Sequence, residues 1–574
     1  MNLPGGGVEI STSSPVFIAS PATAKIDEVT VGHSSGDGSL GVKYDPNALG
    51  GAGLSELLDV GSALVGNGGK GSVRIEAMTP WTPPPPGGPL AVAAMKTAVL
   101  TVGETTEGKV ELGGPHGAVA IFGACTVGGK MGGNGILSLD NGSWLQMDSM
   151  KIGAQAGSLG NVLIGGGSTA KIGTGTGGDV AVGGDPTQPG GAGNLYLFGS
   201  GKLVLGGTLT VWSGGKLNFE SPDGTQTGGR VETPIANIFG KVSGSGALAA
   251  NSVTAHPGSE FTVQSGKTIW IETAAPFNTG GQIQLSGGSV KSSSGVSLLS
   301  GGKIEGFGKV QGTYQGAAGG LLWVKGGEME VGEATLDNAF AHAGDVTVDL
   351  GAQLAIASKT PGALSGQIQL SGGTLWSSNG IKSQPSSSLV GSGGVFGPVW
   401  NGGKIAPGFS AGRIEYYDGL VLEATSLLDL DIGGLTPGTG HDRIDVSGDL
   451  VVGGKLRLHF IDQFENDIES EDWFTVLAAS GDLTGVFTNV TPGERLWTAD
   501  GLGTFQVDYG PGSSYGPRSV VFSHFNPVPE PSSLILLGTF IAGLRLVGAH
   551  VFRRARCDCS HRGRKSSGNR KPSY

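Results

Sequence analysis

Short apolar runs that stop at glycine constrain the fold of this chain more than any other feature. Between Gly135 and Gly183, apolar residues occupy every second position for a few residues and then meet a glycine, as in Gly160–Gly165 and Ala170–Gly173. Alternation with a period of two indicates β-strands. Strands this short are not stable alone, but stacked coils let each strand pair with neighbours above and below it. The pattern therefore predicts a β-solenoid with narrow coils.

The glycine content supports this interpretation. The chain has 110 glycines in 574 residues, 14% charged residues and 6% aromatic residues. Glycine without a strict Gly-X-Y triplet excludes collagen, and the many Val, Leu and Ile residues between the glycines argue against simple disorder. Closely stacked strands joined by tight glycine turns are consistent with both observations.

Longer repeats follow the short ones. Gly281–Gly288 recurs with an identical sequence at Gly366–Gly373, and Gly301–Ile304 returns as Gly402–Ile405. We therefore expect two tandem modules of roughly 90 residues, each several coils long.

Beyond Ala406 the strands become fuller and glycine pairs become fewer. Leu427–Ile432 and Trp473–Leu477 alternate apolar and polar residues as half-exposed strands do. Because the last coil of a solenoid has an unpaired strand edge and an open core, we expect a β-rich cap there.

Parts of the chain resemble the passenger of bacterial autotransporter-like surface proteins, which has glycine-rich repeats and a distinct end of the stem. Ile152–Val182 is similar to the repeats, and Ala406–Ile414, His441–Gly448 and Gly481–Phe487 are similar to the end of the passenger stem. The resemblance implies a right-handed parallel β-helix, closed by the C-terminal cap.

The C-terminus combines a proline-bracketed motif, an apolar run and a basic cluster. The apolar run Leu534–Phe552 has 19 residues, about 28 Å as a helix, which can span a bilayer core of roughly 30 Å. This order resembles the PEP-CTERM sorting signal, which implies cleavage by a membrane-embedded exosortase. A permanent transmembrane anchor is the alternative. The sorting motif is Val528, Pro529, Glu530 and Pro531, and the residues that stop and orient the helix are Arg553, Arg554 and Arg556.

Charge and cysteine content restrict the location and the partners. Before Pro527 the chain carries 27 basic and 45 acidic residues, a net charge of −18. An acidic body with a basic tail argues against nucleic-acid binding and fits a cell-surface protein. Cys125, Cys557 and Cys559 cannot form a disulfide framework, so we expect Cys125 to be a free, buried thiol. No export signal is visible at Met1–Gly7, and we expect the true start to lie upstream.

Several groups of residues carry side chains that can take part in catalysis or bind a metal. Asp429 and Asp431 lie two apart on one strand and so face the same side, as the carboxylates of a polysaccharide-cleaving enzyme do. His441 and Asp442 could act in acid–base catalysis. The polar face of a strand explains the first pair, and turn chemistry explains the second. Cys557, Cys559 and His561 supply only three ligands where structural zinc normally has four.

We therefore expect an exported, non-enzymatic, structural or adhesive surface protein without catalytic residues, metal or cofactor. Its expected partners are an exosortase, the membrane and an extracellular polysaccharide. The alternative is a surface-anchored β-helix polysaccharide lyase or hydrolase. The predicted segments are 1–79, N-terminal glycine-rich β repeats; 80–89, a proline-rich linker; 90–220, a short-coil solenoid; 221–400, the two tandem modules; 401–526, the cap; and 527–574, the sorting signal with a single transmembrane helix.

Overall fold

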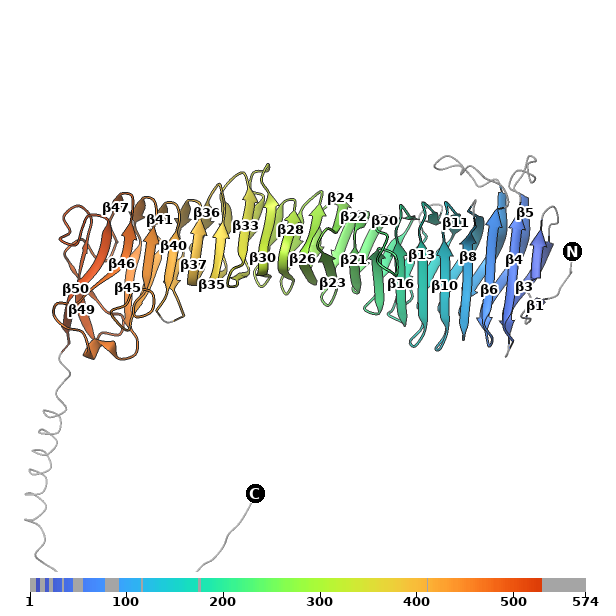
Figure 1. Cartoon of the computed structure of the whole chain (residues 1–574), viewed down its shortest axis with the longest axis horizontal. Helices are drawn as coiled ribbons and strands as arrows, with labels where there is room; N and C mark the ends of the chain where they lie inside the picture. The colour runs from blue at the N-terminus through green and yellow to red at the C-terminus, as the bar shows by residue number, and fades with distance from the viewer. Residues whose placement is uncertain are drawn as a thin grey trace, which may run out of the picture.

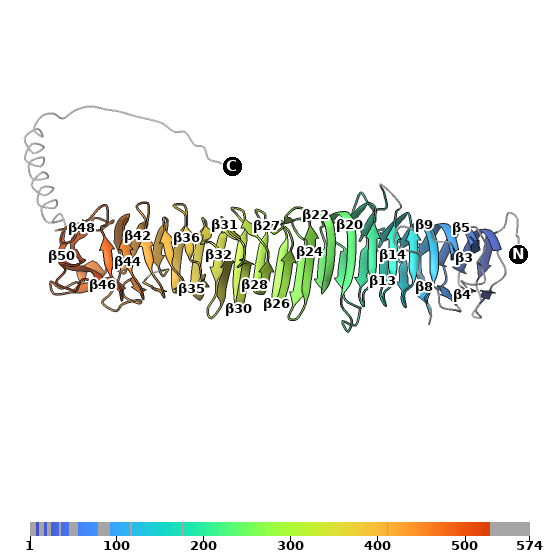
Figure 2. The same ribbon diagram turned by 90° about the horizontal axis from the view of Figure 1, so that it is seen from above.

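The chain forms a long rod of stacked β-strands (Figures 1 and 2). The computed structural model describes residues 7–10, 16–19, 24–33, 36–44, 55–77, 92–114, 117–173, 177–409 and 411–528. Among these residues there is no α-helix, and η1 (Phe464–Asn466) is a single 3-10 turn. The predicted all-β solenoid with parallel strands is confirmed. The predicted linker 80–89 and the predicted helix Leu534–Phe552 lie outside the described residues.

Each coil of the rod contributes strands to three parallel sheets in turn. Where one strand bends at a corner, its two halves belong to two sheets. Sheet 1 contains β2 (Val16–Ala19), β4 (Gly38–Tyr44), β6 (Gly71–Ala77), β8 (Glu107–Gly113), β10 (Asn134–Leu139), β13 (Leu159–Ile164), β16 (Ala192–Leu197), β19 (Gly215–Phe219), β21 (Lys241–Gly244), β23 (Glu260–Gln264), β32 (Asp345–Val348), β39 (Lys404–Pro407), β42 (Leu427–Ile432), β45 (Lys455–Phe460) and the first halves of β26 (Gln282–Ser292), β28 (Lys303–Gln311), β30 (Leu321–Glu333), β35 (Gln367–Trp376) and β37 (Ser388–Phe396).

Sheet 2 follows sheet 1 in every coil. It contains β11 (Trp144–Met147), β14 (Thr169–Ile172), β17 (Lys202–Leu205), β24 (Thr268–Thr273), β33 (Gln353–Ser358), β40 (Arg413–Tyr416), β43 (Arg443–Val446), β46 (Trp473–Ala479), the second halves of β26, β28, β30, β35 and β37, and the first halves of β3 (Ala24–His33), β5 (Ser55–Asn67), β7 (Val92–Val102), β9 (Val119–Val127), β20 (Gly229–Ile238) and β22 (Gly246–Ala255).

Sheet 3 completes the coil. It contains β1 (Gly7–Ile10), β12 (Ser149–Ile152), β15 (Val180–Val182), β18 (Thr208–Val211), β25 (Phe277–Thr279), β27 (Val296–Leu298), β29 (Tyr314–Gly316), β31 (Phe340–His342), β34 (Gly362–Leu364), β36 (Ile381–Ser383), β38 (Val399–Asn401), β41 (Leu420–Leu422), β44 (Leu450–Val452), β47 (Leu483–Gly485) and the second halves of β3, β5, β7, β9, β20 and β22.

The core runs along the axis of the rod, between the three sheets. Alternate residues of each strand point inward, and the register places Leu137 beside Val162 and Val162 beside Leu195 in successive coils. All three side chains are buried. Cys125 is a free thiol within this core, as predicted, and burial raises its pKa to about 12.

The identical segments of the long repeat occupy equivalent places. Both begin a strand in sheet 1, in β26 and in β35, and both bend into sheet 2 after a glycine with positive φ. These glycines are Gly287 (φ 86°) and Gly372 (φ 83°). A side chain is strained in this backbone conformation, which explains why the repeat carries glycine there.

The C-terminal end of the rod is closed by antiparallel strands. Parallel pairing continues through the first part of the predicted cap as far as β47. β48 (Arg495–Trp497), β49 (Gly503–Tyr509) and β50 (Ser519–Pro527) then form an antiparallel sheet that joins β46.

The outer edge of β45 is covered by the segment that leads into and follows β48. The Asn489 side chain accepts a hydrogen bond from Leu456 N (3.0 Å) and donates one to Leu456 O (2.8 Å). Further along the edge, Ala499 N donates to Leu458 O, and Asp500 accepts from Phe460 N. These contacts give partners to backbone groups of Leu456, Leu458 and Phe460 on the last sheet 1 strand without another coil.

Candidate functional site

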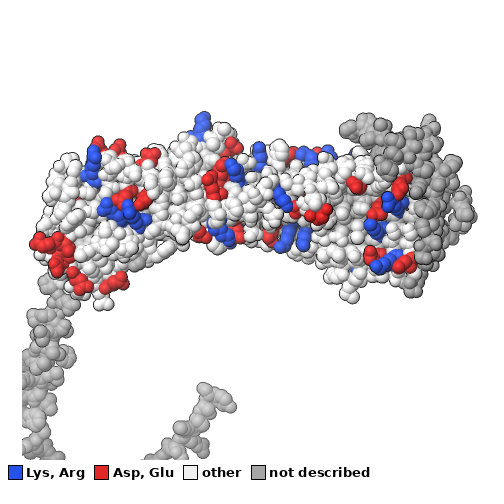
Figure 3. Space-filling model, in the orientation of Figure 1, with Lys and Arg blue, Asp and Glu red and all other residues white. Residues whose placement is uncertain are grey.

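The outer face of sheet 1 carries polar side chains along much of the rod. Strand alternation turns every second side chain outward, and many of these side chains are charged or carry amides and hydroxyls. On the face of the molecule seen in Figure 3, Lys and Arg lie beside Asp and Glu in separate mixed clusters. Three groups of polar residues lie along this outer face.

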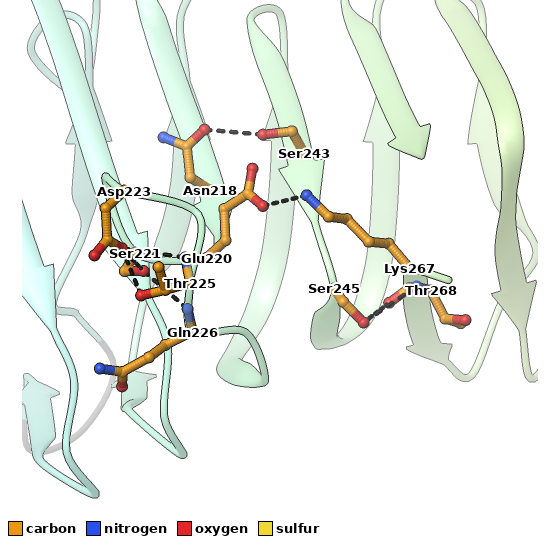
Figure 4. Close-up of polar contacts among 10 residues, drawn as sticks. All are labelled: Asn218, Glu220, Ser221, Asp223, Thr225, Gln226, Ser243, Ser245, Lys267 and Thr268. Atoms are coloured by element: carbon orange, nitrogen blue, oxygen red, sulfur yellow. Dashed lines mark hydrogen bonds and ion pairs between the residues drawn. The ribbon is translucent and has the colours of Figure 1, made fainter. Parts of the chain in front are cut away.

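The first group is a groove of about 290 Å³ across β19, β21 and β23. Asn218 and Ser243 lie on neighbouring strands of its floor, and the Ser243 hydroxyl donates to Asn218 Oδ1 (2.9 Å), as Figure 4 shows. Asn218 Nδ2 is buried and has no hydrogen-bond partner among the described residues. Asn218 Nδ2 is therefore covered by its surroundings, and the hydrogen bond from Ser243 holds the Asn218 amide in the floor of the groove.

Ion pairs border the same groove. Lys241 contacts Glu260 (2.6 Å), and its hydrogen bond lowers the pKa of Glu260. Glu220 pairs with Lys267, two coils further on (Figure 4). Because each of these carboxylates has a cationic partner, the groove holds fixed charges of both signs and no isolated acid.

The second group surrounds Glu305 on β28. Glu305 is only 5% exposed. Gln282 Nε2 donates to it (2.8 Å), and Lys303 and Lys325 contact it at 2.5 and 3.2 Å. Burial alone would raise the pKa of Glu305, but the hydrogen bonds from the two lysines lower it. Both lysines also lie over the ring of Trp323, at 4.4 and 4.0 Å from its centroid. The cluster is therefore a closed network of mutually satisfied groups.

The third group contains the predicted pair Asp429 and Asp431, which both point outward from β42. Asp429 contacts Lys404 (2.7 Å), Arg457 (2.6 and 2.7 Å) and His459 (3.1 Å). Burial opposes ionisation of Asp429, but the hydrogen bonds from Arg457 and Lys404 outweigh it and lower the pKa of Asp429 to about 2. Burial raises the pKa of Asp431. The two neighbouring carboxyls are thus shifted in opposite directions.

His441 and Asp442 lie inside the fold rather than on this face, at 2% and 1% exposure. Asp442 accepts hydrogen bonds from Gly412 N (2.8 Å) and Asp431 N (2.9 Å), and burial raises its pKa to about 8. His441 Nδ1 lies 3.1 Å from Gly434 O, and its ring packs edge-on against Phe474. These contacts fix the loop after β42 and leave neither side chain open to a substrate.

Of the predicted sorting residues the structure describes Val528, which is 42% exposed at the end of the cap and donates its N–H to Leu502 O (2.9 Å). The others lie outside the described residues, as do Cys557, Cys559 and His561. Within the described part of the chain, no helix is long and apolar enough to cross a membrane, and no group of three His, Cys, Asp or Glu could hold a metal ion.

Sequence reasoning missed the groove and the Glu305 cluster. Their members come from different coils, and the sequence does not show which strands become neighbours. The one sign of them in the sequence is that polar residues occupy alternate positions of the strands that form sheet 1. A comparison with protein-family models and with curated proteins finds no match for this chain.

Proposed function

We propose that this chain is a non-enzymatic surface or matrix protein, a right-handed β-helix rod delivered through its C-terminal sorting signal. An exosortase cleaves it at the membrane after Leu534–Phe552 has inserted as a transmembrane helix. The rod then has a structural or adhesive role outside the cell. The resemblance of Pro529-Glu530-Pro531 and the basic cluster to PEP-CTERM signals supports the sorting step.

The observation that carries the non-enzymatic role is that the negative charge of Asp429 is paired with basic side chains. A general acid or base needs a pKa near the working pH and an open path to the substrate. Asp429 is ionised and held by three basic side chains. Glu305 and Glu260 are paired in the same way. Such faces bind ligands through fixed polar groups more readily than they transfer protons.

Replacement of Glu530 by Ala tests the sorting step. In a host with an exosortase, membrane insertion should persist while removal of the helix stops, because the apolar run is intact and the motif is not. Mass spectrometry of the surface protein then detects peptides from Arg556 to Tyr574 in the variant but not in the wild type. A Ser532→Ala variant is the matched control. Recovery of those peptides from the wild type contradicts the proposal.

One observation favours a second candidate, a polysaccharide hydrolase. Neighbouring carboxyls with pKa values shifted apart are typical of acid and nucleophile or base pairs, and Asp429 and Asp431 have this property. Release of reducing ends from polysaccharides by the purified chain, abolished in Asp431→Asn, would establish this candidate. Absence of release by the wild type eliminates it.

A further inference from the structure

A second, larger groove of about 450 Å³ lies across β6, β8, β10 and β13 and ends at Phe198, just after β16. One outward row of side chains follows its length, and the printed register aligns its members in successive coils. They are Arg74, Glu111, Ser138 and Leu163. Since neighbouring strands lie about 4.8 Å apart, the groove extends roughly 19 Å along the rod from the coil of Arg74 to that of Phe198.

Gly113 leaves the groove hollow near one end. The second row, two residues further along each strand, has Gly113 beside Glu76, and a side chain added at Gly113 would meet no atom within 4 Å. At Gly165 the opposite holds, because the ring of Phe198 lies directly on its backbone and occupies the space of a side chain. The floor is therefore open at Gly113 and bounded by an aromatic ring at the far end.

The lining is amphipathic and weakly charged. Leu163 and the half-buried Phe198 form an apolar end, and Ser138, Asp140 and Asn141 supply hydroxyl, carboxylate and amide groups. The Asn141 amide is fixed by its bond to Gly114 O (2.9 Å), and Asp140 accepts from Asn141 N (2.8 Å). Arg74 pairs with Glu76, and Glu111 pairs with Lys109 (2.5 Å). No uncompensated cation among the described lining residues invites an anion.

We propose that this groove binds a stretch of a neutral polysaccharide laid along the rod. A sugar ring presents an apolar C–H face to an aromatic side chain and hydroxyls at its rim to carboxylates, amides and arginine. In this groove Phe198 supplies the aromatic ring at one end, Asp140 and Asn141 supply carboxylate and amide groups, and Arg74 supplies the guanidinium at the other end. The groove has room for several sugar units. A peptide strand would instead need a free sheet edge, and sheet 1 is paired on both sides here. This proposal names a ligand class for the adhesive role proposed above.

Calorimetry with the purified full chain tests the proposal. The probes are the neutral hexasaccharides of cellulose, xylan, mannan, β-1,3-glucan and chitin, with oligogalacturonate as the anionic comparison. We expect at least one neutral probe to bind. Binding of oligogalacturonate alone, or of no probe, overturns the proposal.

Two variants locate the binding. Gly113→Trp fills the groove, and because Gly113 lacks a positive φ and has open space around it, the chain should fold normally. Phe198→Ala removes the apolar end. Each should weaken binding at least about tenfold. Gly512→Trp, at an equally open glycine in a cap loop, is the matched control and should bind as the wild type does. Unchanged affinity in Gly113→Trp overturns the proposal.

The outcome is independent of the sorting step. Binding is measured on purified protein, whereas sorting is measured by retention of Arg556–Tyr574 in cells. If the chain binds sugars but keeps its C-terminal helix, the groove proposal stands and the sorting proposal is wrong. If the C-terminal helix is removed but the chain binds no sugar, the sorting proposal stands and the groove proposal is wrong.

Discussion

Arg230 and Glu272 are joined by two hydrogen bonds, of 2.8 and 2.7 Å, that pass over an entire coil of the solenoid. The coil between them, in β22, presents only Ala247 and Ala249 at the crossing point. Small side chains there leave the guanidinium free to reach the carboxylate. Arg230 also contacts Glu232 (2.8 Å), so it ties together charges from non-adjacent strands of sheet 2.

Replacing Arg230 by Met should lower the denaturant midpoint. The pair is bidentate, but the Arg230 side chain is 37% exposed, so solvent screening limits the expected loss to about 1 kcal/mol. Lys359→Met, which removes a 3.5 Å pair between two well-exposed side chains, should have no measurable effect. Equal effects of the two variants would contradict the structural role of Arg230.

The same pair predicts a pH dependence. The hydrogen bond from Arg230 lowers the pKa of Glu272 in the folded state. A depressed pKa means that the stabilisation is present above the unfolded-state pKa of about 4.3 and is lost as the pH falls through the folded value. The difference in unfolding midpoint between the wild type and Glu272→Gln should therefore shrink below pH 4. A difference that persists at pH 3 would show that charge is not its source.

Asp442 should give a pH dependence of stability with the opposite sign to that of Glu272. Burial raises its folded-state pKa to about 8, so its contribution to stability is fully present below the unfolded value of about 3.9 and is lost as the pH rises to about 8. The wild type should lose stability relative to Asp442→Asn between pH 5 and pH 8, as followed by denaturant unfolding at each pH. A constant difference across that range would mean that Asp442 does not titrate there.

Gly306→Ala should be severely destabilising. Gly306 has φ 105°, and an added Cβ would lie 1.9 Å from Leu285 O in the preceding coil. Backbone strain and this clash together should cost about 3 kcal/mol or more. Thermal unfolding followed by circular dichroism measures the loss. Gly512→Ala, at an open position without positive φ, should unfold as the wild type does.

Asn489→Ala should uncover the end of the solenoid. The Asn489 side chain satisfies both backbone groups of Leu456 on the outer edge of β45. Its loss leaves these groups without their partner, at a cost of about 1–3 kcal/mol, and exposes a strand edge that can pair with another chain. Size-exclusion chromatography should show concentration-dependent oligomers. Asn466→Ala, on the exposed 3-10 turn η1, is the control and should remain unchanged.

Several features of the fold could be predicted from local pattern alone. The alternation of Leu427–Ile432 placed Asp429 and Asp431 on one outward face, and the lack of a disulfide framework among the three cysteines indicated that Cys125 is a free, buried thiol. The identical segments that begin at Gly281 and Gly366 take the same path around a coil because they carry the same strand and the same corner glycine. The sorting motif from Pro529 onward stays a prediction.

The sequence by itself determined the type of structure, because strand alternation and glycine turns are set by a few neighbouring residues. Such short strands can satisfy their backbone hydrogen bonds only by stacking on other strands. Only the tertiary structure decided which residues became neighbours. Gly108 pairs with Gly71, 37 residues earlier, whereas Lys404 pairs with Ser388, only 16 residues earlier. Because loops of such different lengths separate the coils, no fixed period predicts that Gly113 lies open in the groove that ends at Phe198, or that Arg230 reaches Glu272.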